Sequence, residues 1–261
     1  MMGIYQHFRK HEHPFVDLVL SWKSRVEEMY QRVTTDFLDP REQEIAKTIL
    51  GKQSDLYYYD FAGGSPNAER KRLIIAPFYE EIKADDFDLV LLESEYASKF
   101  VSLSHRHVLG TLMSLGIDRK KTGDIYVLDD TFYLFLTGDM VDFVSLHLTK
   151  IKNSSVALKQ VDWHEGIESN DEWIKKDYIL SSLRLDVFIK EVYQLSRNKA
   201  ADFIKNDFVK VNHTNVIDPA IQLMEDDLIS VRKYGRSKFL HTGNRTRKDN
   251  IVVTAAKLKT K

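Results

Sequence analysis

The pattern of residues 183–234 constrains the fold of this chain more than any other stretch. Apolar side chains recur there at helical spacing, which predicts a helix with one buried face, at Leu185, Phe188, Ile189 and Val192. Ser196 is a good N-cap for a second short helix. The runs 208–212 and 228–232 alternate as half-buried strands. The stretch therefore predicts two small helices followed by a twisted hairpin.

Two cations stand at the start of the second predicted helix. Arg197 and Lys199 occupy its first turn, where the helix dipole is positive and acidic side chains are favoured. Each misplaced cation costs a few tenths of a kcal/mol, up to roughly 1 kcal/mol at low salt. Together with the free N–H groups of the first turn, the two cations form an anion site that a phosphate fits. The alternative is that both side chains are solvated surface residues.

Five motifs follow one another within this stretch. They are Arg184-Leu185-Asp186, Ser196-Arg197-x-x-Ala200, Phe203-Ile204, Val209-x-Val211-Asn212 and Asp227-x-Ile229-x-Val231-Arg232. In this order they resemble the S4 RNA-binding domain, which is also appended to tRNA synthetases and ribosome-rescue factors. Asp207, His213 and Asp226 stand where that family usually has glycine. Because Asp tolerates positive φ better than most residues, the turns are expected to survive, and His213 is the residue expected to alter the hairpin tip.

Length and composition bound the remaining possibilities. At 261 residues the chain can hold two or three small domains, and an apolar content of 43% supports real cores. It has no cysteine, which excludes disulfides, cysteine nucleophiles and thiolate metal sites. No apolar run approaches the length of a membrane span, and residues 1–14 contain no hydrophobic segment resembling a signal peptide. We expect a cytoplasmic protein that does not contact membranes.

The formal net charge of −1 hides a strong asymmetry. Residues 183–261 carry 16 Lys and Arg against 9 Asp and Glu, so this part is +7 and the rest of the chain is −8. Such a split is typical of a polyanion-binding end on an acidic body, and a solvated basic tail is the alternative. The run Ile251-Val252-Val253 favours a hairpin with residues 237–240. Its tip would carry Arg245, Arg247 and Lys248.

The first 82 residues predict a region of helices and a hairpin. An apolar stripe predicts a helix over residues 14–32, and Asp39-Pro40 begins a second helix that ends at Gly51. Residues 55–61 and 72–78 flank a Gly-Gly-Ser-Pro loop and form the hairpin. The basic side chains near this loop are secondary candidates for RNA contact: Arg70, Lys71 and Arg72.

The middle of the chain predicts strands and helices in the order β-α-β-β-α-β. The strands are 87–92, 124–128, 131–136 and 155–162, and the helices are 104–115 and 139–148. This order is that of the ferredoxin-like plait, a frame that RRM domains share. We expect Phe132, Tyr133 and Phe135 to be core residues, with a base-stacking platform as the alternative. The basic loop after the first helix is the better candidate for RNA contact, through Arg119, Lys120 and Lys121.

The predicted fold class is α+β. Its parts are an N-terminal α/β region (1–82), a ferredoxin-like, RRM-like plait (83–168), a linker strand (169–182), an S4 domain (183–240) and a basic C-terminal hairpin or tail (241–261). Residues 165–171 are the predicted connection to the last domain.

The sequence offers no assembled catalytic site. There is no Rossmann glycine fingerprint and no synthetase nucleotide signature, and the loop at Gly63-Gly64 lacks a Walker ending. Three histidines near the start suggest metal ligands, but no second ligand set is visible and we expect a flexible leader: His7, His11 and His13. We therefore predict no enzyme activity, no cofactor and no metal.

Two further blocks extend the resemblance over the whole chain. They are Gly63-Gly64-Ser65-Pro66-x-Ala68-Glu69-Arg70-Lys71-Arg72 and Leu115-Gly116-Ile117-x-Arg119-x-x-x-Gly123-Asp124-Ile125. With the S4-like block they resemble the YlmH-like, or RqcP2-like, proteins encoded beside bacterial cell-division genes, in which a bulkier residue is common at the position of Ser65. The resemblance implies a monomeric, non-catalytic factor. It would bind rRNA and tRNA on the large ribosomal subunit, alongside other quality-control factors that act on stalled chains.

This interpretation assigns RNA contact to the S4-like block. The predicted residues are Arg184, Ser196, Arg197, Lys199, Lys205, Asn212, Arg232, Lys233, Arg236 and Lys238. Two other hypotheses stay open. One is an RNA-modifying enzyme whose active site lies in the plait, and the other is a division scaffold that binds protein through acidic N-terminal surfaces.

Overall fold

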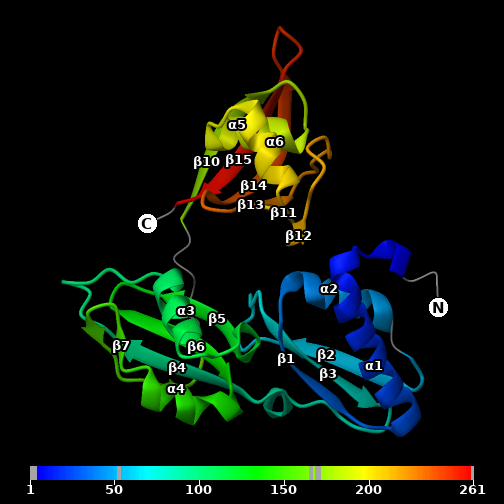
Figure 1. The fold of residues 1–261 in the computed structure, drawn as a ribbon, viewed down its shortest axis with the longest axis vertical. Coiled ribbons are helices and arrows are strands. Elements are labelled where there is room, and N and C mark those ends of the chain that lie inside the picture. Colours follow the sequence, from blue (N-terminus) through cyan, green and yellow to red (C-terminus); the bar gives the residue numbers. More distant parts are fainter. Residues whose placement is uncertain (1–4, 52–53, 165–166, 168–171, 260–261) are drawn as a thin grey trace. The chain divides into compact units, whose positions relative to one another are not determined.

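The chain forms two compact units, residues 1–170 and 171–261. The computed structural model describes residues 5–51, 54–164, 167 and 172–259. Both units mix helices with antiparallel sheets (Figure 1). The predicted connection over residues 165–171 lies, apart from Ile167, outside the described residues. Among the helices of the described part, none is both long and apolar enough to span a bilayer.

Unit 1 begins with two helices packed on a three-stranded sheet. The elements are α1 (His13–Met29), β1 (Val33–Leu38), α2 (Pro40–Leu50), β2 (Tyr57–Ala62) and β3 (Lys71–Pro77), with strand order β1-β3-β2. The two predicted helices and the hairpin are confirmed. Strand β1 was not predicted, because Val33 continues the apolar stripe of α1. The helix ends earlier, at Met29, because Tyr30 after it adopts a left-handed conformation with a φ of 54°.

The residues before α1 are ordered, so the predicted flexible leader is wrong for the described residues. Two single 3-10 turns, η1 (Tyr5–His7) and η2 (Lys10–Glu12), lead into the helix, and Tyr5 and Phe8 pack on its core. The buried carboxylate of Glu12 accepts a hydrogen bond of 2.8 Å from Nε of Arg41. No cluster of three or more potential metal ligands occurs among the residues described.

The second half of unit 1 is a four-stranded sheet. Its elements are η3 (Ala84–Phe87), β4 (Leu89–Glu95), α3 (His105–Ser114), η4 (Arg119–Lys121), β5 (Thr122–Val127), β6 (Thr131–Thr137), η5 (Gly138–Met140), α4 (Val141–His147), β7 (Lys150–Ile151), β8 (Ser154–Ser155) and β9 (Lys159–Val161). The sheet order is β5-β6-β4-β9, and every pair is antiparallel. The last strand is shorter than predicted because residues 150–155 form a separate small hairpin.

Both faces of this sheet are covered. Helices α3 and α4 share a core with Phe132 on one face. On the other face, Tyr133 and Phe135 are buried against Phe37 of β1. The three aromatic side chains are 0–6% exposed, so the prediction that they are core residues is confirmed. A base cannot stack on rings that are already packed in this way.

The loop between β2 and β3 locks the two halves of unit 1 together. Gly64 lies directly on the ring of Phe135 with a φ of +88°, and a Cβ there would meet the ring at 2.1 Å. The hydroxyl groups of Ser65 and Tyr126 are 2.8 Å apart. The carboxylate of Asp124 accepts hydrogen bonds from the backbone N–H groups of residues 69 and 70, at 2.7 and 3.2 Å, and burial raises its pKa.

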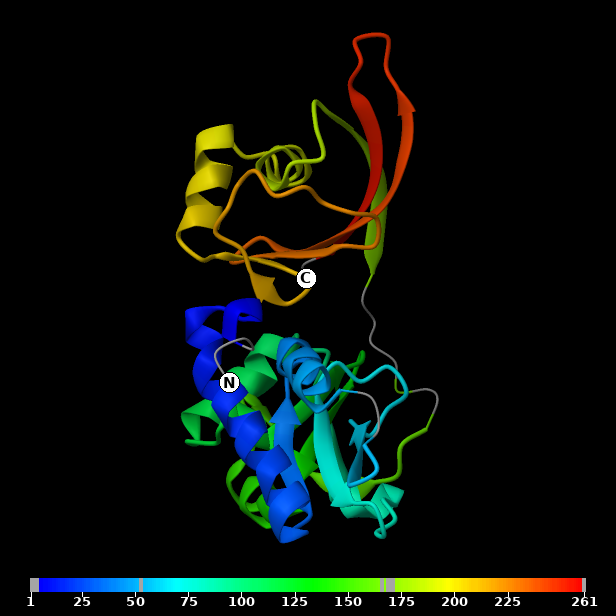
Figure 2. The same cartoon turned by 90° about the vertical axis from the view of Figure 1, so that its right-hand side faces the viewer.

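Unit 2 is a six-stranded sheet with two helices. The elements are β10 (Trp173–Leu180), α5 (Leu185–Tyr193), α6 (Arg197–Lys205), β11 (Val209–Val211), β12 (Thr214–Asn215), β13 (Leu228–Val231), β14 (Gly235–Arg245) and β15 (Ile251–Leu258), in sheet order β10-β15-β14-β13-β11-β12. Figure 2 shows α5 and α6 against one face of this sheet. The predicted helices and strands of this region are present. Asp207, His213 and Asp226 all adopt positive φ, so the turns do tolerate the loss of glycine.

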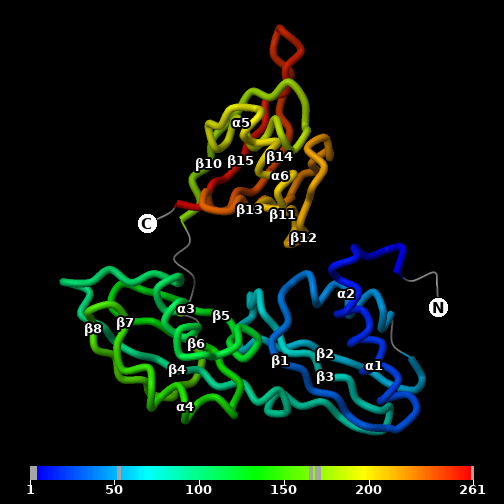
Figure 3. The backbone as a smooth tube through the Cα atoms, viewed as in Figure 1, coloured from blue at the N-terminus to red at the C-terminus, as the bar shows by residue number. Residues whose placement is uncertain are grey.

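The predicted linker strand and C-terminal hairpin belong to this same sheet. Strand β10 pairs along its whole length with β15, from Trp173 opposite Leu258 to Leu180 opposite Ile251. It is therefore an edge strand of unit 2 rather than a free connection. Strands β14 and β15 form the predicted hairpin and extend beyond the rest of the unit (Figure 3). The register differs from the predicted one, because Ile251 and Val253 pair with Arg245 and Thr242, while Ser237 and Phe239 pair with Lys257 and Ala255.

Candidate nucleic-acid interface

One buried carboxylate holds two of the predicted RNA-binding arginines. Asp186, at the start of α5, is 3% exposed. Its oxygens accept hydrogen bonds from Nε and a terminal nitrogen of Arg184 at 2.9 and 3.0 Å, and from Nε of Arg197 at 3.2 Å. Burial raises the pKa of Asp186, but the hydrogen bonds from the two guanidinium groups outweigh it and hold the pKa below the ordinary value. The carboxylate is therefore ionised at neutral pH and fixes both arginines.

The start of α6 has the predicted cap. The Ser196 hydroxyl accepts a hydrogen bond of 3.2 Å from the backbone N–H of Lys199. Ala200 is fully buried, so the first turn packs closely on the core while Arg197 and Lys199 stay exposed. A capped helix start with two exposed cations suits a phosphate group.

Aromatic rings support the neighbouring cations. Nζ of Lys199 lies 5.7 Å from the ring centre of Tyr234, and the guanidinium carbon of Arg232 lies 5.0 Å from that of Phe208. Phe203 contacts both rings edge-on. Cation–π contacts of this kind are worth about 0.5–1 kcal/mol at exposed sites and restrict the position of each charge. We call Arg184, Arg197, Lys199 and Arg232 the helix surface.

Two predicted residues lie on a different face of unit 2. Ser237 and Phe239 of β14 are buried beneath the helices. Because successive side chains of a strand point to opposite faces, Arg236 and Lys238 lie on the face turned away from α5 and α6. The ten predicted residues therefore do not form one cradle, which corrects the single surface expected from the sequence.

The other predicted residues of unit 2 have different environments. Lys205 is exposed in the last turn of α6, and Lys233 is exposed in the turn between β13 and β14. Both ends of the Asn212 side chain are used internally: Nδ2 donates to Asp227 at 2.7 Å, and Oδ1 accepts from the backbone of Leu228 at 2.8 Å. Asn212 thus fixes the turn between β11 and β12.

The secondary candidates near the first hairpin turn inward. Arg72 is 8% exposed and donates to the backbone carbonyls of Thr35 at 2.7 Å and Asp88 at 3.1 Å. The guanidinium group therefore serves the core, which argues against the expected RNA contact through Arg72. Arg70 donates to the carbonyls of Thr122 and Phe37 at 3.1 and 2.9 Å. Lys71 is half-buried.

The basic turn η4 is largely tied down as well. Arg119 donates to the carbonyl of Gly123 at 3.0 Å and to Thr122, and burial lowers its pKa to about 10. Lys121 lies between Asp36 and Asp139, at 2.9 and 3.0 Å. Lys120 is the member of this turn that stays exposed. At the tip of the long hairpin, Arg245 pairs with Asp249 at 2.7 Å, while Arg247 and Lys248 are exposed.

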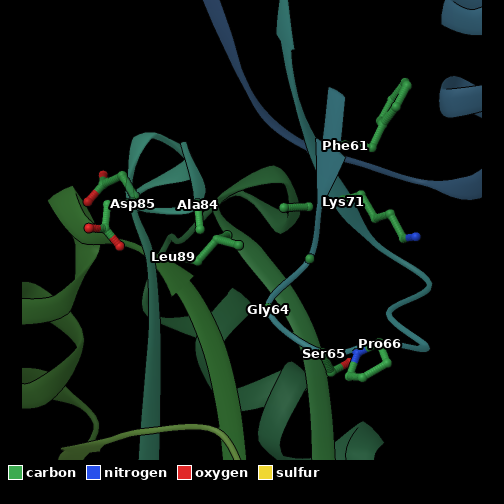
Figure 4. A pocket seen from close by; sticks show the side chains of 11 residues that line it. Phe61, Gly64, Ser65, Pro66, Lys71, Ala84, Asp85 and Leu89 are labelled. Atoms are coloured by element: carbon green, nitrogen blue, oxygen red, sulfur yellow. The ribbon is translucent and has the colours of Figure 1, made fainter. Parts of the chain in front are cut away.

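A groove in unit 1 lies beside the Gly-Gly loop (Figure 4). The Gly64 to Pro66 loop and Lys71 form one wall, and Ala84, Asp85 and Leu89 form the other. Of the charged side chains that line it, Lys71 comes from β3, whereas Asp85 and Asp88 come from η3 and the residue that follows it. The carboxylate of Asp88 accepts a hydrogen bond from the backbone N–H of Gly138 at 3.1 Å. The groove presents no nucleophile paired with a base.

The sequence did not single out several residues that belong to the basic surfaces of unit 2. Tyr234 and Phe208 hold cations of the helix surface, yet nothing in the sequence pattern set them apart from core aromatics. Lys175 and Lys210 lie on the same sheet face as Lys238, because Lys175 and Lys238 both pair with Ala256 and Lys210 shares the partner Ser230 with Arg236. The alternation of Trp173, Lys175 and Asp177 was the available signal for this face.

Comparison with known proteins agrees with this architecture. A family model described as "YlmH, N-terminal" matches residues 11–80, and one described as "Putative RNA-binding domain in YlmH" matches residues 83–165. The ribosome-associated protein quality control protein P2 of Bacillus subtilis (strain 168) is 41% identical, over 97% of this chain and 98% of its own. The solved structure of cell division protein ylmH from Streptococcus pneumoniae is 30% identical, with a TM-score of 0.54. It covers 64% of this chain and 100% of its own.

These matches define a class of mixed α/β proteins built around an RNA-binding domain. With 41% identity over nearly its whole length to one member, and with matches to both family models, the chain belongs to the YlmH family. The family resemblance seen in the sequence is thereby confirmed.

Proposed function

We propose that this protein is a non-catalytic RNA-binding factor that binds rRNA and tRNA on the large ribosomal subunit in the cytoplasm. Its task there would be quality control of stalled chains. The Bacillus subtilis relative is named for ribosome-associated quality control, and its likeness extends over nearly the whole chain. The match to an RNA-binding domain over residues 83–165 supports the same role.

The topology supports two finer assignments within this proposal. Residues 83–168 are proposed to be a ferredoxin-like plait, because the antiparallel order β5-β6-β4-β9 with α3 and α4 on one face is the arrangement of that fold. Residues 183–240 are proposed to be an S4 domain, because two short helices precede a twisted sheet and carry the Arg184-Leu185-Asp186 and Ser196-Arg197 motifs.

The observation that carries the proposal is the position of Asp186. A buried carboxylate that orients one half-buried and one exposed guanidinium group beside a capped helix start is a preorganised site for phosphate. Arg184 and Arg197 remain 34% and 60% exposed while they are held. Arginine is suited to this role because its planar fork binds phosphate oxygens in pairs.

Co-sedimentation with purified large ribosomal subunits tests this function. The wild-type protein is expected to pellet with the subunits, and an Arg197→Ala, Lys199→Ala double variant is expected to stay in the supernatant. A Lys190→Ala, Lys259→Ala variant removes the same charge from unit 2 at residues already paired with Glu191 and Glu172. This control should pellet like the wild type, and equal loss in both variants would remove the helix surface from the proposal.

Two assays address the other hypotheses. An RNA-modifying enzyme predicts that rRNA or tRNA from a deletion strain lacks one modification by mass spectrometry, and we expect an unchanged pattern. A division scaffold predicts protein partners that survive nuclease treatment in pull-downs, and we expect the partners to be lost with the RNA.

A further inference from the structure

We infer that the sheet of unit 2 has a second RNA-binding surface on the face turned away from α5 and α6. We call this surface, formed by Trp173, Lys175, Lys210, Arg236 and Lys238, the open face. The inference rests on the proposed function and goes beyond it: unit 2 would contact two RNA segments at once, one on the helix surface and one on the open face.

Strand register places the open-face cations together. Lys175 of β10 and Lys238 of β14 are both paired with Ala256 of the strand between them. Residues paired across neighbouring strands share a face, and strands are about 4.7–4.9 Å apart, so the two lysine stems start roughly 10 Å from each other. In the same way, Ser230 of β13 lies between Lys210 and Arg236. The result is two adjacent rows of cations, contributed by β10, β11 and β14.

Burial confirms which face this is. Ser237, Phe239 and Ala255 are 0–1% exposed, and the latter two belong to the core beneath the helices. The residues that alternate with them on β14 are Arg236 and Lys238, which therefore point the other way. Lys175, Lys210 and Lys238 are exposed. The helices cover only the opposite face, as Figure 2 shows.

The chemistry of the open face suits an RNA strand. Nζ of Lys238 lies 4.6 Å from the ring centre of Trp173, a half-buried aromatic side chain on the same face. Asp177 is the acidic residue that alternates with Trp173 and Lys175, and its carboxylate accepts a hydrogen bond from Thr254 at 2.6 Å. Cations with an aromatic ring among them bind a phosphate backbone and a base face.

The two surfaces cannot serve one local RNA contact. The helices pack on one face of the sheet and the open face is the other, so the thickness of the core separates them. Each surface has its own aromatic support, Tyr234 and Phe208 on the helix side and Trp173 on the open face. A protein with this arrangement can bridge two RNA elements that approach from opposite sides.

Native mass spectrometry with a short RNA stem–loop at low salt tests the inference, because it counts RNA copies per protein. We expect the Lys175→Gln, Lys238→Gln variant to bind one copy fewer than the wild-type protein. Glutamine keeps enough of each stem to cover Ala256 and Trp173, so the sheet should stay folded, which circular dichroism checks. The Arg197→Gln, Lys199→Gln variant should also bind one copy fewer than the wild type, and the combined variant two copies fewer, while any copy held by unit 1 remains.

A Lys190→Gln, Lys259→Gln variant is the matched control and should bind as many copies as the wild type, because both lysines are already paired with carboxylates. If the helix-surface variant loses a copy and the open-face variant loses none, the proposed function stands and the second surface does not. A wild type that binds no stem–loop would contradict the proposed function itself.

Discussion

The carboxylate of Asp186 lies 3.2 Å from Nε of Arg197, which places a buried acid of α5 against an exposed cation of α6. Because the same carboxylate also binds Arg184, the acid determines where two positive charges face solvent. Under the proposed function, the stability of the helix pair and its affinity for RNA would therefore depend on the same residue.

Replacing Asp186 distinguishes the effect of guanidinium orientation on RNA binding from the effect of net charge. Asp186→Asn adds one unit of positive charge, so charge alone predicts tighter RNA binding, whereas loss of the fixed guanidinium groups predicts weaker binding. We expect weaker binding in a fluorescence titration. Asp202→Asn, on the exposed side of α6, adds the same charge and should bind RNA at least as well as the wild type. Tighter binding by both variants would show that orientation is unimportant.

The same residue should make the stability of unit 2 sensitive to acid. The pKa of Asp186 is lowered in the folded state, so its ionised form contributes stability at neutral pH. This contribution is lost as the pH falls through the lowered pKa. Urea unfolding at pH 7 should show that Asp186→Asn is less stable than the wild type by about 1–3 kcal/mol, and the gap should close in strong acid. A gap that persists at low pH would contradict the linkage.

Salt dependence measures how many phosphates the helix surface neutralises. The affinity for RNA should fall steeply with salt, and Arg197→Ala with Lys199→Ala should make the log–log slope shallower by about 0.7–0.9 for each phosphate that is no longer neutralised. The Lys190→Ala, Lys259→Ala control should leave the slope unchanged. A slope that is the same in all three proteins would remove Arg197 and Lys199 from the interface.

Arg72 should matter for folding rather than for RNA. Arg72→Met leaves buried carbonyls without their donor, and we expect a loss of about 1–3 kcal/mol in the unfolding free energy of unit 1. Lys71→Met removes the same charge from the neighbouring half-buried residue and should change stability by no more than about 0.5 kcal/mol. Denaturant titration compares them. An Arg72 variant of normal stability and weak RNA binding would restore the interpretation that the structure corrects.

Gly64 tests how the β2–β3 loop is locked onto the four-stranded sheet. Gly64→Ala should cost about 1–2 kcal/mol for its positive φ and a further 1–3 kcal/mol because the new Cβ meets the ring of Phe135. Gly116 also has positive φ, +81°, but nothing lies within 4 Å of a Cβ there. Gly116→Ala should therefore show the φ cost alone. Equal melting temperatures for the two variants would argue against close packing of Gly64 on the ring.

Tyr193 should make unit 2 sensitive to alkali. Its hydroxyl donates to Ser237 at 3.0 Å, and burial raises its pKa to about 12. The neutral phenol is therefore favoured by folding, and its contribution is complete below the ordinary pKa of about 10 and lost as the pH rises towards 12. Tyr193→Phe should flatten the loss of stability over that range. Absorbance titration of the phenol provides the direct measurement.

The parts of the fold that depend on local periodicity were predictable. The helix stripe at Leu185 to Val192, the cap at Ser196 and the β2–β3 hairpin of unit 1 all follow from side-chain spacing. What spacing does not show is where a basic side chain finds its partner. Arg72 and Arg119 look like exposed cations in the sequence. Arg72 donates to a carbonyl that only the tertiary fold brings within reach, and Arg119 turns back to carbonyls three and four residues further along its own loop.

The candidate site was predictable in composition and less so in geometry. Arg197 and Lys199 lie at a capped helix start as predicted, while Arg236 and Lys238 fall on the opposite side of the sheet. The cause is the two-residue period of a strand, since a shift of one residue moves a side chain to the opposite face of the sheet. Without the pairing of β14 with β13 and β15, the direction of that alternation is undetermined.

The pairing of Trp173 with Leu258 has a consequence for biosynthesis. The first strand of unit 2 finds its neighbour only in β15, so the sheet cannot close until residues 251–258 have been translated. Long-range pairing of this kind is slow compared with the formation of the two helices. The nascent unit must therefore wait with β10 unpartnered until the ribosome that makes it has released β15.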